Sequence, residues 1–138
     1  MEERRKVIVF GTFDGVHEGH RDFFRQAAQH GDITAVVARD NIVEQLKKRG
    51  AQYSEDERLW SVKEEKYITN AVFGDTELSV YRVIEEIDPD IICLGYDQNV
   101  LKEDVRLWVR ENRKDVQLIQ MKPYYPEKYH TSIKKKAA

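Results

Sequence analysis

The chain is poor in the features that would tie it to an oxidising compartment, a membrane or nucleic acid. Its 138 residues include one cysteine, Cys93, which excludes an internal disulfide framework and every multi-cysteine zinc site. No apolar run approaches the ~20 residues of a membrane span, and the N-terminal residues contain no stretch typical of a signal peptide. The net charge of −2 argues against a general nucleic-acid-coating role. We therefore expect one cytoplasmic domain over residues 1–138, with neither membrane nor nucleic acid as a partner.

The sequence alternates short apolar runs with longer stretches whose apolar residues have helical spacing. The apolar runs predict strands at 6–10, 33–38, 71–73, 91–94 and 116–121. The helical spacing predicts helices at 19–30, 41–50, 54–62, 80–87 and 101–109. Strands without polar alternation, each followed by a helix, are typical of a doubly wound α/β domain, here with a five-stranded parallel sheet. Ligands of such sheets bind beyond the carboxyl ends of the strands.

Residues 11–20, Gly-Thr-Phe-Asp-Gly-Val-His-Glu-Gly-His, follow the first predicted strand. Their glycines permit a sharp turn into a helix whose free N–H groups favour a phosphate. His17 and His20 share this terminus, so their rings can face one point and stabilise charge on a phosphate in a transition state. Ordinary capping histidines are the alternative at this point. A zinc pair lacks a third ligand, and neither a P-loop nor a dinucleotide fingerprint is present.

This segment closely resembles the G-x-F-D-x-x-H-x-G-H signature of the cytidylyltransferase-like nucleotidyltransferases. That family includes glycerol-3-phosphate and choline-phosphate cytidylyltransferases and the archaeal-type FAD synthetases. The resemblance implies a Rossmann-like nucleotidyltransferase fold, with the two histidines as catalytic residues. It also implies nucleotide contacts from Gly11, Thr12 and Phe13 together with the histidines. Relatives are commonly dimers, so a homodimer is expected.

Two further segments resemble those with which the family binds the substrate that accepts the nucleotide. The resemblance implies that a lysine near 47–49 reaches the phosphates of both substrates; we choose Lys47, although the register is open by one residue and a solvated helix end is the alternative. Arg58 ends an acidic segment and is expected either to contact a substrate phosphate or to pair with a nearby glutamate: Glu55, Glu57 or Glu64. Asp14 is expected to orient the acceptor or a metal-bound water.

Two other segments resemble the nucleotide side. Leu-Gly-Tyr-Asp-Gln at 94–98 resembles the family's G-x-D segment, with Gly95 allowing close approach and Asp97 accepting from a ribose hydroxyl or base amine. Residues 127–138 are expected to form a phosphate-binding segment and tail. There Thr131 and Ser132 match the [ST]-[ST]-x-I-[RK] motif, but the isoleucine comes one residue early. The basic partner therefore stays open among Lys134, Lys135 and Lys136, and a plain lysine-rich tail is the alternative.

The resemblance as a whole implies transfer of a nucleoside monophosphate from a nucleoside triphosphate, ATP or CTP, to a phosphorylated acceptor. Mg²⁺ is expected to arrive on the triphosphate rather than on protein ligands. The forms of 94–98 and of Val-Ala-Arg-Asp at 37–40 favour FMN as acceptor and an FMN adenylyltransferase. A flavin needs an aromatic or apolar wall, for which Tyr124, Tyr125 and Tyr129 are candidates. The alternatives are a cytidylyltransferase acting on glycerol 3-phosphate or a similar alcohol, and a non-catalytic nucleotide-binding module.

Overall fold

The computed structural model describes residues 4–112 and 114–124, and its elements follow the predicted order. The strands are β1 (Lys6–Gly11), β2 (Asp32–Val37), β3 (Ile68–Phe73), β4 (Ile91–Leu94) and β5 (Gln117–Gln120). The helices are α1 (Glu18–Ala28), α2 (Asp40–Lys47), α3 (Glu55–Lys63), α4 (Arg82–Ile87) and α5 (Asn99–Glu111). Within the described part of the chain, no helix is both long enough and apolar enough to cross a bilayer.

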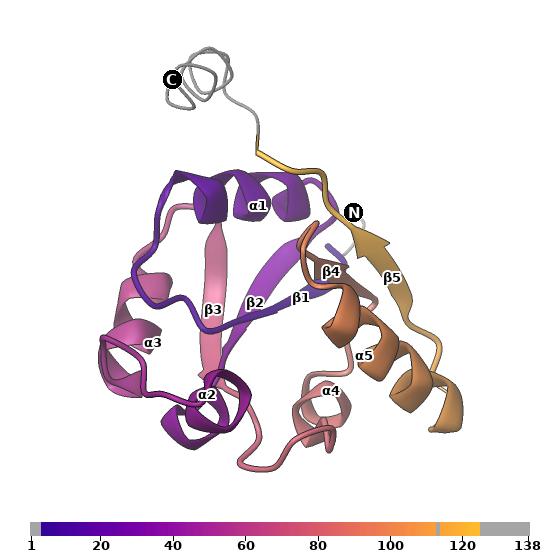
Figure 1. The fold of residues 1–138 in the computed structure, drawn as a ribbon. Coiled ribbons are helices and arrows are strands. Elements are labelled where there is room, and N and C mark those ends of the chain that lie inside the picture. The colour runs from indigo at the N-terminus through magenta and orange to yellow at the C-terminus, as the bar shows by residue number, and fades with distance from the viewer. Residues whose placement is uncertain (1–3, 113, 125–138) are drawn as a thin grey trace, which may run out of the picture.

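The five strands form one parallel sheet in the order β3-β2-β1-β4-β5, seen from left to right in Figure 1. This order confirms the predicted doubly wound α/β fold. The chain moves outward from β1 to β3 and then crosses back to β4 on the other side of β1. The reversal places a crevice between the carboxyl ends of β1 and β4, where ligands of such folds bind.

Helices cover both faces of the sheet because alternate side chains of each strand point to opposite faces. Val7 and Val9 of β1 belong to a buried cluster that includes side chains of α1 and α3. Ile8 and Phe10 belong to a second cluster with side chains of α4 and α5. All four side chains are at least nine-tenths buried, which is why the strands read as continuous apolar runs.

The helix ends differ from prediction in several places. The N-cap of α2 is Arg39 rather than Asn41, whose side-chain amide instead donates to the Thr76 carbonyl. Lys48, in the left-handed conformation, ends α2 before Gly50. The third helix begins at Ser54 as predicted, and Ser54 forms a capping box with both of its hydrogen bonds present.

Strand pairing explains one more difference. Strand β3 begins at Ile68, three residues before the predicted start, because it pairs with β2 from Ile33 onward. Polar residues inside β3 interrupt its apolar run, which is why the sequence predicted a later start for this strand.

Candidate active site

The two histidines predicted to act together lie side by side where β1 turns into α1. Their ring centroids are 3.9 Å apart and the ring planes are tilted by 32°. His17 is the N-cap of α1 and His20 is its third residue. The spacing of three residues places both rings at the helix N-terminus, whose partial positive charge favours an anion.

Backbone hydrogen bonds fix the orientation of both rings. The His17 Nδ1 accepts from the Gly19 amide at 3.1 Å, and the His20 Nδ1 accepts from the His17 amide at 3.2 Å. The arrangement is a capping box built from two histidines. Because each Nδ1 is an acceptor, the neutral rings carry their proton on Nε2. The pair therefore presents two Nε2–H donors.

Burial and a neighbouring ring keep His20 uncharged near neutral pH. Burial, followed by the charge of His17, lowers the pKa of His20 to about 4, against the opposing effect of Asp97. Phe13 supplies part of this surrounding, since its ring lies edge-on to His20 with centroids 5.5 Å apart. Phe13 is 3% exposed, so only its backbone is available to contact a nucleotide.

Two glycines of the turn are required by close packing around these rings. A Cβ on Gly11 would lie 2.6 Å from the Phe13 ring, and Phe13 itself has a positive φ of 54°. A Cβ on Gly19 would lie 3.0 Å from Cε1 of His17. The glycine between the histidines therefore leaves room for the first ring.

Asp14 holds a neighbouring loop in place. Its two carboxylate oxygens accept from the amides of Gln52 and Tyr53 at 2.7 and 2.9 Å. Burial opposes ionisation of Asp14, but these hydrogen bonds and the positive charges of Arg58 and Lys47 together keep its pKa below the ordinary value. Lys47 is thus near enough for its charge to act on Asp14.

Arg58 corrects the expectation of a substrate-binding arginine. Its side chain is fully buried, and it donates to the carbonyls of Thr12, Ala38 and Tyr53 at 2.7–3.0 Å. Its ion-pair partner is Asp40 at 2.7 Å, not one of the three glutamates considered from the sequence. Arg58 therefore holds the chain in place directly after β1 and directly after β2.

The loop after β4 lies on the other side of the crevice. Asp97 is near enough for its charge to act on the pKa of His20. Gln98 links the two strands, because its side chain accepts from the Gly95 amide at 2.7 Å and donates to the Phe10 carbonyl at 2.9 Å. Gln120 on β5 donates to the carbonyls of Gly95 and Tyr96. Gln98 was not predicted to be a site residue, although it is the last residue of the 94–98 motif.

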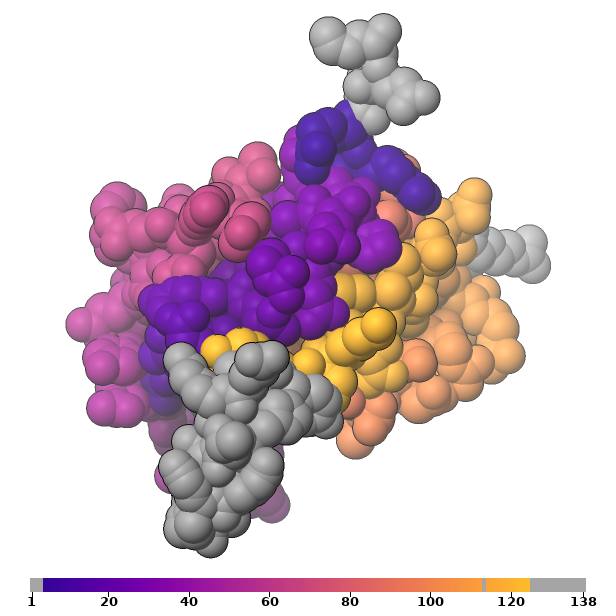
Figure 2. Space-filling model, turned by 90° about the horizontal axis from the view of Figure 1, so that it is seen from above, coloured from indigo at the N-terminus to yellow at the C-terminus, as the bar shows by residue number. Residues whose placement is uncertain are grey.

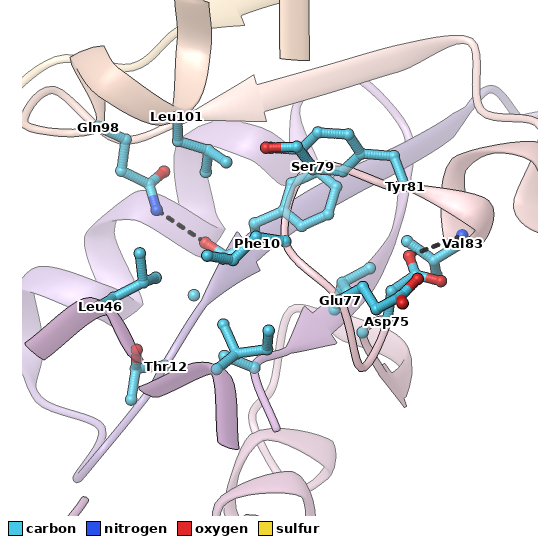
Figure 3. Close-up of a pocket in the computed structure, with 16 residues that line it drawn as sticks. Phe10, Thr12, Leu46, Asp75, Glu77, Ser79, Tyr81, Val83, Gln98 and Leu101 are labelled. Carbon is cyan, nitrogen blue, oxygen red and sulfur yellow. Dashed lines mark hydrogen bonds between the residues drawn. The ribbon is translucent and has the colours of Figure 1, made fainter. Parts of the chain in front are cut away.

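A pocket of about 270 Å³ opens at the carboxyl ends of β1, β2 and β3, on the side of α2, α4 and α5 (Figure 3). We call it the β1–β3 pocket. It shares Gly11 and Thr12 with the turn that carries the histidines. Its other lining residues are Phe10, Val36, Ala38, Ile42, Leu46, Gly74, Asp75, Glu77, Leu78, Ser79, Tyr81, Val83, Gln98 and Leu101.

The structure places Tyr124 away from this pocket. Tyr124 lines a second hollow, between α1 and residues 119–124. Gln26 of α1 fixes that segment, since its side chain exchanges two hydrogen bonds with the backbone of Lys122. In Figure 2 the yellow end of the described chain lies against the violet atoms of α1. The predicted flavin wall at Tyr124 is therefore not at the β1–β3 pocket. Thr131, Ser132, Tyr125, Tyr129 and the lysines at 134–136 lie outside the described residues.

No group of three or more histidine, cysteine, aspartate or glutamate side chains that could hold a metal occurs among residues 4–112 and 114–124. Asp14, the acidic residue nearest the turn in sequence, uses both oxygens on backbone amides. The described side chains thus do not fit a protein-held metal.

Comparison with known proteins agrees with this geometry. The cytidylyltransferase-like family matches residues 8–137. The FAD synthase of Aciduliprofundum boonei is 37% identical over 120 residues, which cover 86% of this chain and 79% of the relative. The FAD synthase of Methanoculleus marisnigri is 35% identical over 130 residues, covering 94% and 85%.

Solved structures give the same result for the fold. The lipopolysaccharide core biosynthesis protein of Thermoplasma volcanium is 26% identical with a TM-score of 0.79, covering 88% of this chain and 99% of that one. Pantothenate synthetase of Thermus thermophilus shares the fold alone, with 13% identity, a TM-score of 0.61, and coverage of 92% and 59%. On its sequence match and on its architecture, this chain belongs to the cytidylyltransferase-like family and is a nucleotidyltransferase.

Proposed function

We propose that this chain transfers the adenylyl group of ATP to FMN, forming FAD and releasing pyrophosphate. The observation that carries the proposal is the pair of histidine rings held side by side at the N-terminus of α1, each with its Nδ1 accepting from a backbone amide. The choice of FMN and ATP rests on the FAD synthases whose sequences match most of this chain.

In this reaction a phosphate oxygen of FMN attacks the α-phosphorus of ATP. The new P–O bond forms as the bond to the bridging oxygen of pyrophosphate breaks. A phosphate is already ionised near neutral pH, so the enzyme needs no strong general base. The rate then depends on in-line positioning and on stabilising the charge that grows on the oxygens.

The proposed roles are those that the family resemblance implies for each residue. His17 and His20 donate from Nε2 to the α-phosphate and to the leaving bridge oxygen. Lys47 balances phosphate charge beside the turn, and Gly95 and Asp97 hold the nucleotide on the β4 side. Thr131, Ser132 and one of the lysines at 134–136 complete the phosphate contacts in this proposal.

Mg²⁺ enters as part of the triphosphate substrate, where it offsets the negative charge of the phosphate oxygens. Asp14 and Arg58 take positioning roles, because their polar groups are already bound to the loop at 52–53 and to the strand ends. They keep the turn in the shape that the histidines require.

The test is to incubate the purified protein with FMN, ATP and Mg²⁺, and to resolve FAD by chromatography while measuring pyrophosphate. We expect FAD and pyrophosphate in equal amounts. His17→Ala removes one donor and lowers the rate by about 100- to 1,000-fold. The matched control is His30→Ala, since His30 lies beyond the last residue of α1 and lines the second hollow.

Other products would point elsewhere. A CDP-linked product from CTP and glycerol 3-phosphate, without FAD from FMN, would establish the cytidylyltransferase alternative. Nucleotide binding with no release of pyrophosphate from any acceptor would indicate a binding module.

A further inference from the structure

We propose that Gln120 of β5 is a positioning residue for the nucleotide: its side-chain amide holds the loop after β4 in the shape in which Gly95 and Asp97 receive the triphosphate. This inference rests on the proposed function, which places the nucleotide at this loop. It assigns the residue that keeps the loop ready for its substrate.

The side-chain amide of Gln120 connects β5 to this loop and to the start of α5. Its Nε2 donates to the carbonyl oxygens of Gly95 and Tyr96, each at 3.1 Å, and to the side-chain oxygen of Asn99 at 2.9 Å. Its Oε1 accepts from the ammonium group of Lys102 at 3.3 Å. Acceptors therefore surround one end of the amide and a cation faces the other end, which fixes the direction in which the amide points.

The register of the last two strands places Gln120 beside the loop. Leu94, the last residue of β4, lies opposite Gln120, and the Met121 amide donates to the Leu94 carbonyl at 2.7 Å. Leu118 and Gln120 point to the same face of the sheet, because side chains alternate along a strand. Leu118 packs there against the apolar cluster that includes side chains of α5, and Figure 1 shows β5 beside that helix. At the next position on this face the chain has a glutamine, which meets backbone carbonyls instead of apolar side chains.

Capping of helix α5 does not account for these contacts. The free backbone groups at the N-terminus of a helix are N–H donors, which need acceptors. Gln120 instead donates, and Gly95 and Tyr96, whose carbonyls accept, both come before the first residue of α5, Asn99. The hydrogen bonds therefore hold the loop itself.

Gln98 holds the same loop from the side of β1. Its side chain accepts from the Gly95 amide and donates to the Phe10 carbonyl, the bond drawn between these residues in Figure 3. The amide of Gly95 is thus bound to Gln98 and its carbonyl to Gln120. A Cβ on Gly95 would lie only 3.3 Å from Oδ1 of Asp97, so this carboxylate folds back over Gly95. The position of Asp97 therefore depends on the backbone that Gln120 holds.

A loop that is fixed in advance lowers the cost of binding. The conformational freedom of the loop does not have to be lost when the nucleotide arrives, so the affinity is higher. Asp97 is also near enough to act on the pKa of His20, so the loop adjoins the proposed reaction centre. Loss of the Gln120 donor should therefore weaken the binding of the nucleotide and leave the binding of the acceptor unchanged.

The experiment compares two substitutions of Gln120 with one of Gln117. Gln120→Glu keeps the shape of the side chain and the contact with Lys102, but it turns a carboxylate oxygen toward the acceptors at Gly95, Tyr96 and Asn99. Gln120→Met removes the donor without adding a charge, and so separates the lost hydrogen bonds from repulsion between a new carboxylate and the triphosphate. Gln117→Glu is the matched control, because Gln117 is exposed and lies at the other end of β5.

We expect both Gln120 variants to raise the KM for ATP in FAD formation by about tenfold or more. The KM for FMN should change by less than about twofold, and Gln117→Glu should match wild type. Thermal unfolding checks that all three variants are folded. An unchanged KM for ATP in the Gln120 variants would overturn the inference. An equal rise in the KM for FMN would show a general structural role, and a rise in Gln120→Glu alone would show an effect of charge; either result would also overturn it.

The two proposals fail in different ways. If the wild-type protein forms no FAD, the proposed function fails. Calorimetric titration with ATP and with CTP, each with Mg²⁺, still decides the role of Gln120, since it requires no acceptor and no turnover. We expect the nucleotide that wild type binds to bind both Gln120 variants about tenfold more weakly and Gln117→Glu equally well. Equal affinity of wild type and Gln120→Met, or no nucleotide binding by wild type, would overturn the inference.

Discussion

The proposed catalytic side chains are also the residues that begin helix α1. His17 and His20 satisfy amide groups that the first helical turn leaves without intrahelical partners. Their hydrogen bonds fix which nitrogen carries the proton, so the helix start and the proposed chemistry depend on the same contacts. Changes close to these rings should therefore alter the rate more than they alter stability.

Gly19→Ala tests this dependence. The added methyl group would lie 3.0 Å from Cε1 and 3.2 Å from Nδ1 of His17, so the ring must move. Alanine favours a helix over glycine by about 1 kcal/mol, so stability should not fall. We expect kcat for FAD formation to fall by about tenfold or more at an unchanged or higher melting temperature. Gly50→Ala is the control, because a Cβ there meets only the Glu44 carboxylate at 3.8 Å; equal rates in both variants would contradict the steric argument.

The pKa of His20 predicts how stability depends on pH. Burial, then the charge of His17, lowers this pKa from 6.5 to about 4 in the folded protein. Between these two values the unfolded chain binds a proton that the folded chain does not, so stability rises with pH across this window. The contribution is therefore complete above pH 6.5 and is lost as the pH falls toward 4. His20→Gln should flatten this part of the stability profile.

Nuclear magnetic resonance measures the same quantity directly. We expect the His20 ring to stay neutral at pH 6, where an ordinary histidine is largely protonated. A His20 titration midpoint near 6.5 would contradict the structural reading of its environment.

Helices α2 and α3 begin side by side and are joined by one group of charged side chains. The Asp40 and Glu55 carboxylates each accept from the other residue's backbone amide, at 3.3 and 2.7 Å respectively. Arg58 then connects Asp40 to the carbonyls of Thr12 and Ala38. The group ties both helices to the strand ends that form the site.

Arg58→Ala should therefore destabilise the whole fold. It removes a fully buried charge partner and leaves three carbonyls without this donor, for which we expect a loss of about 3 kcal/mol in the free energy of unfolding. Chemical denaturation measures this loss. Arg106→Ala is the control, since its ion pair with Glu103 is exposed and should contribute nothing measurable. Equal stability of the two variants would show that the buried network does not support the fold.

The elements were predictable from the sequence where one local signal dominates. The apolar runs of β1 and β4 report burial directly, and the structure confirms both strands and the predicted helix start at Ser54. The partner of Arg58 was not predictable, because Asp40 comes near it only when two helix starts meet. The pocket wall at Ser79 and Tyr81 was missed for the same reason, since Asp104, whose carboxylate accepts from both hydroxyls, is 23 residues from Tyr81.

The whole molecule gathers its functional residues through the order of its strands. With β1 central, the turn carrying the histidines lies between the β4 loop and the ends of β2 and β3. The order of elements along the chain predicted the parallel sheet, and the Gly-Thr-Phe-Asp motif predicted the turn. Neither signal predicted the β1–β3 pocket, because its walls form only when helices α2, α4 and α5 pack on the sheet. The expected homodimer and cytoplasmic location remain predictions.

The end of β1 has one more consequence, because Gly11 and Thr12 line the β1–β3 pocket and lead directly into the turn that carries the histidines. In a direct transfer both substrates must be present at this turn before any bond changes. Initial-rate plots at several fixed concentrations of one substrate should then give intersecting lines. Parallel lines, the pattern of an enzyme that releases pyrophosphate before its second substrate arrives, would contradict a direct transfer.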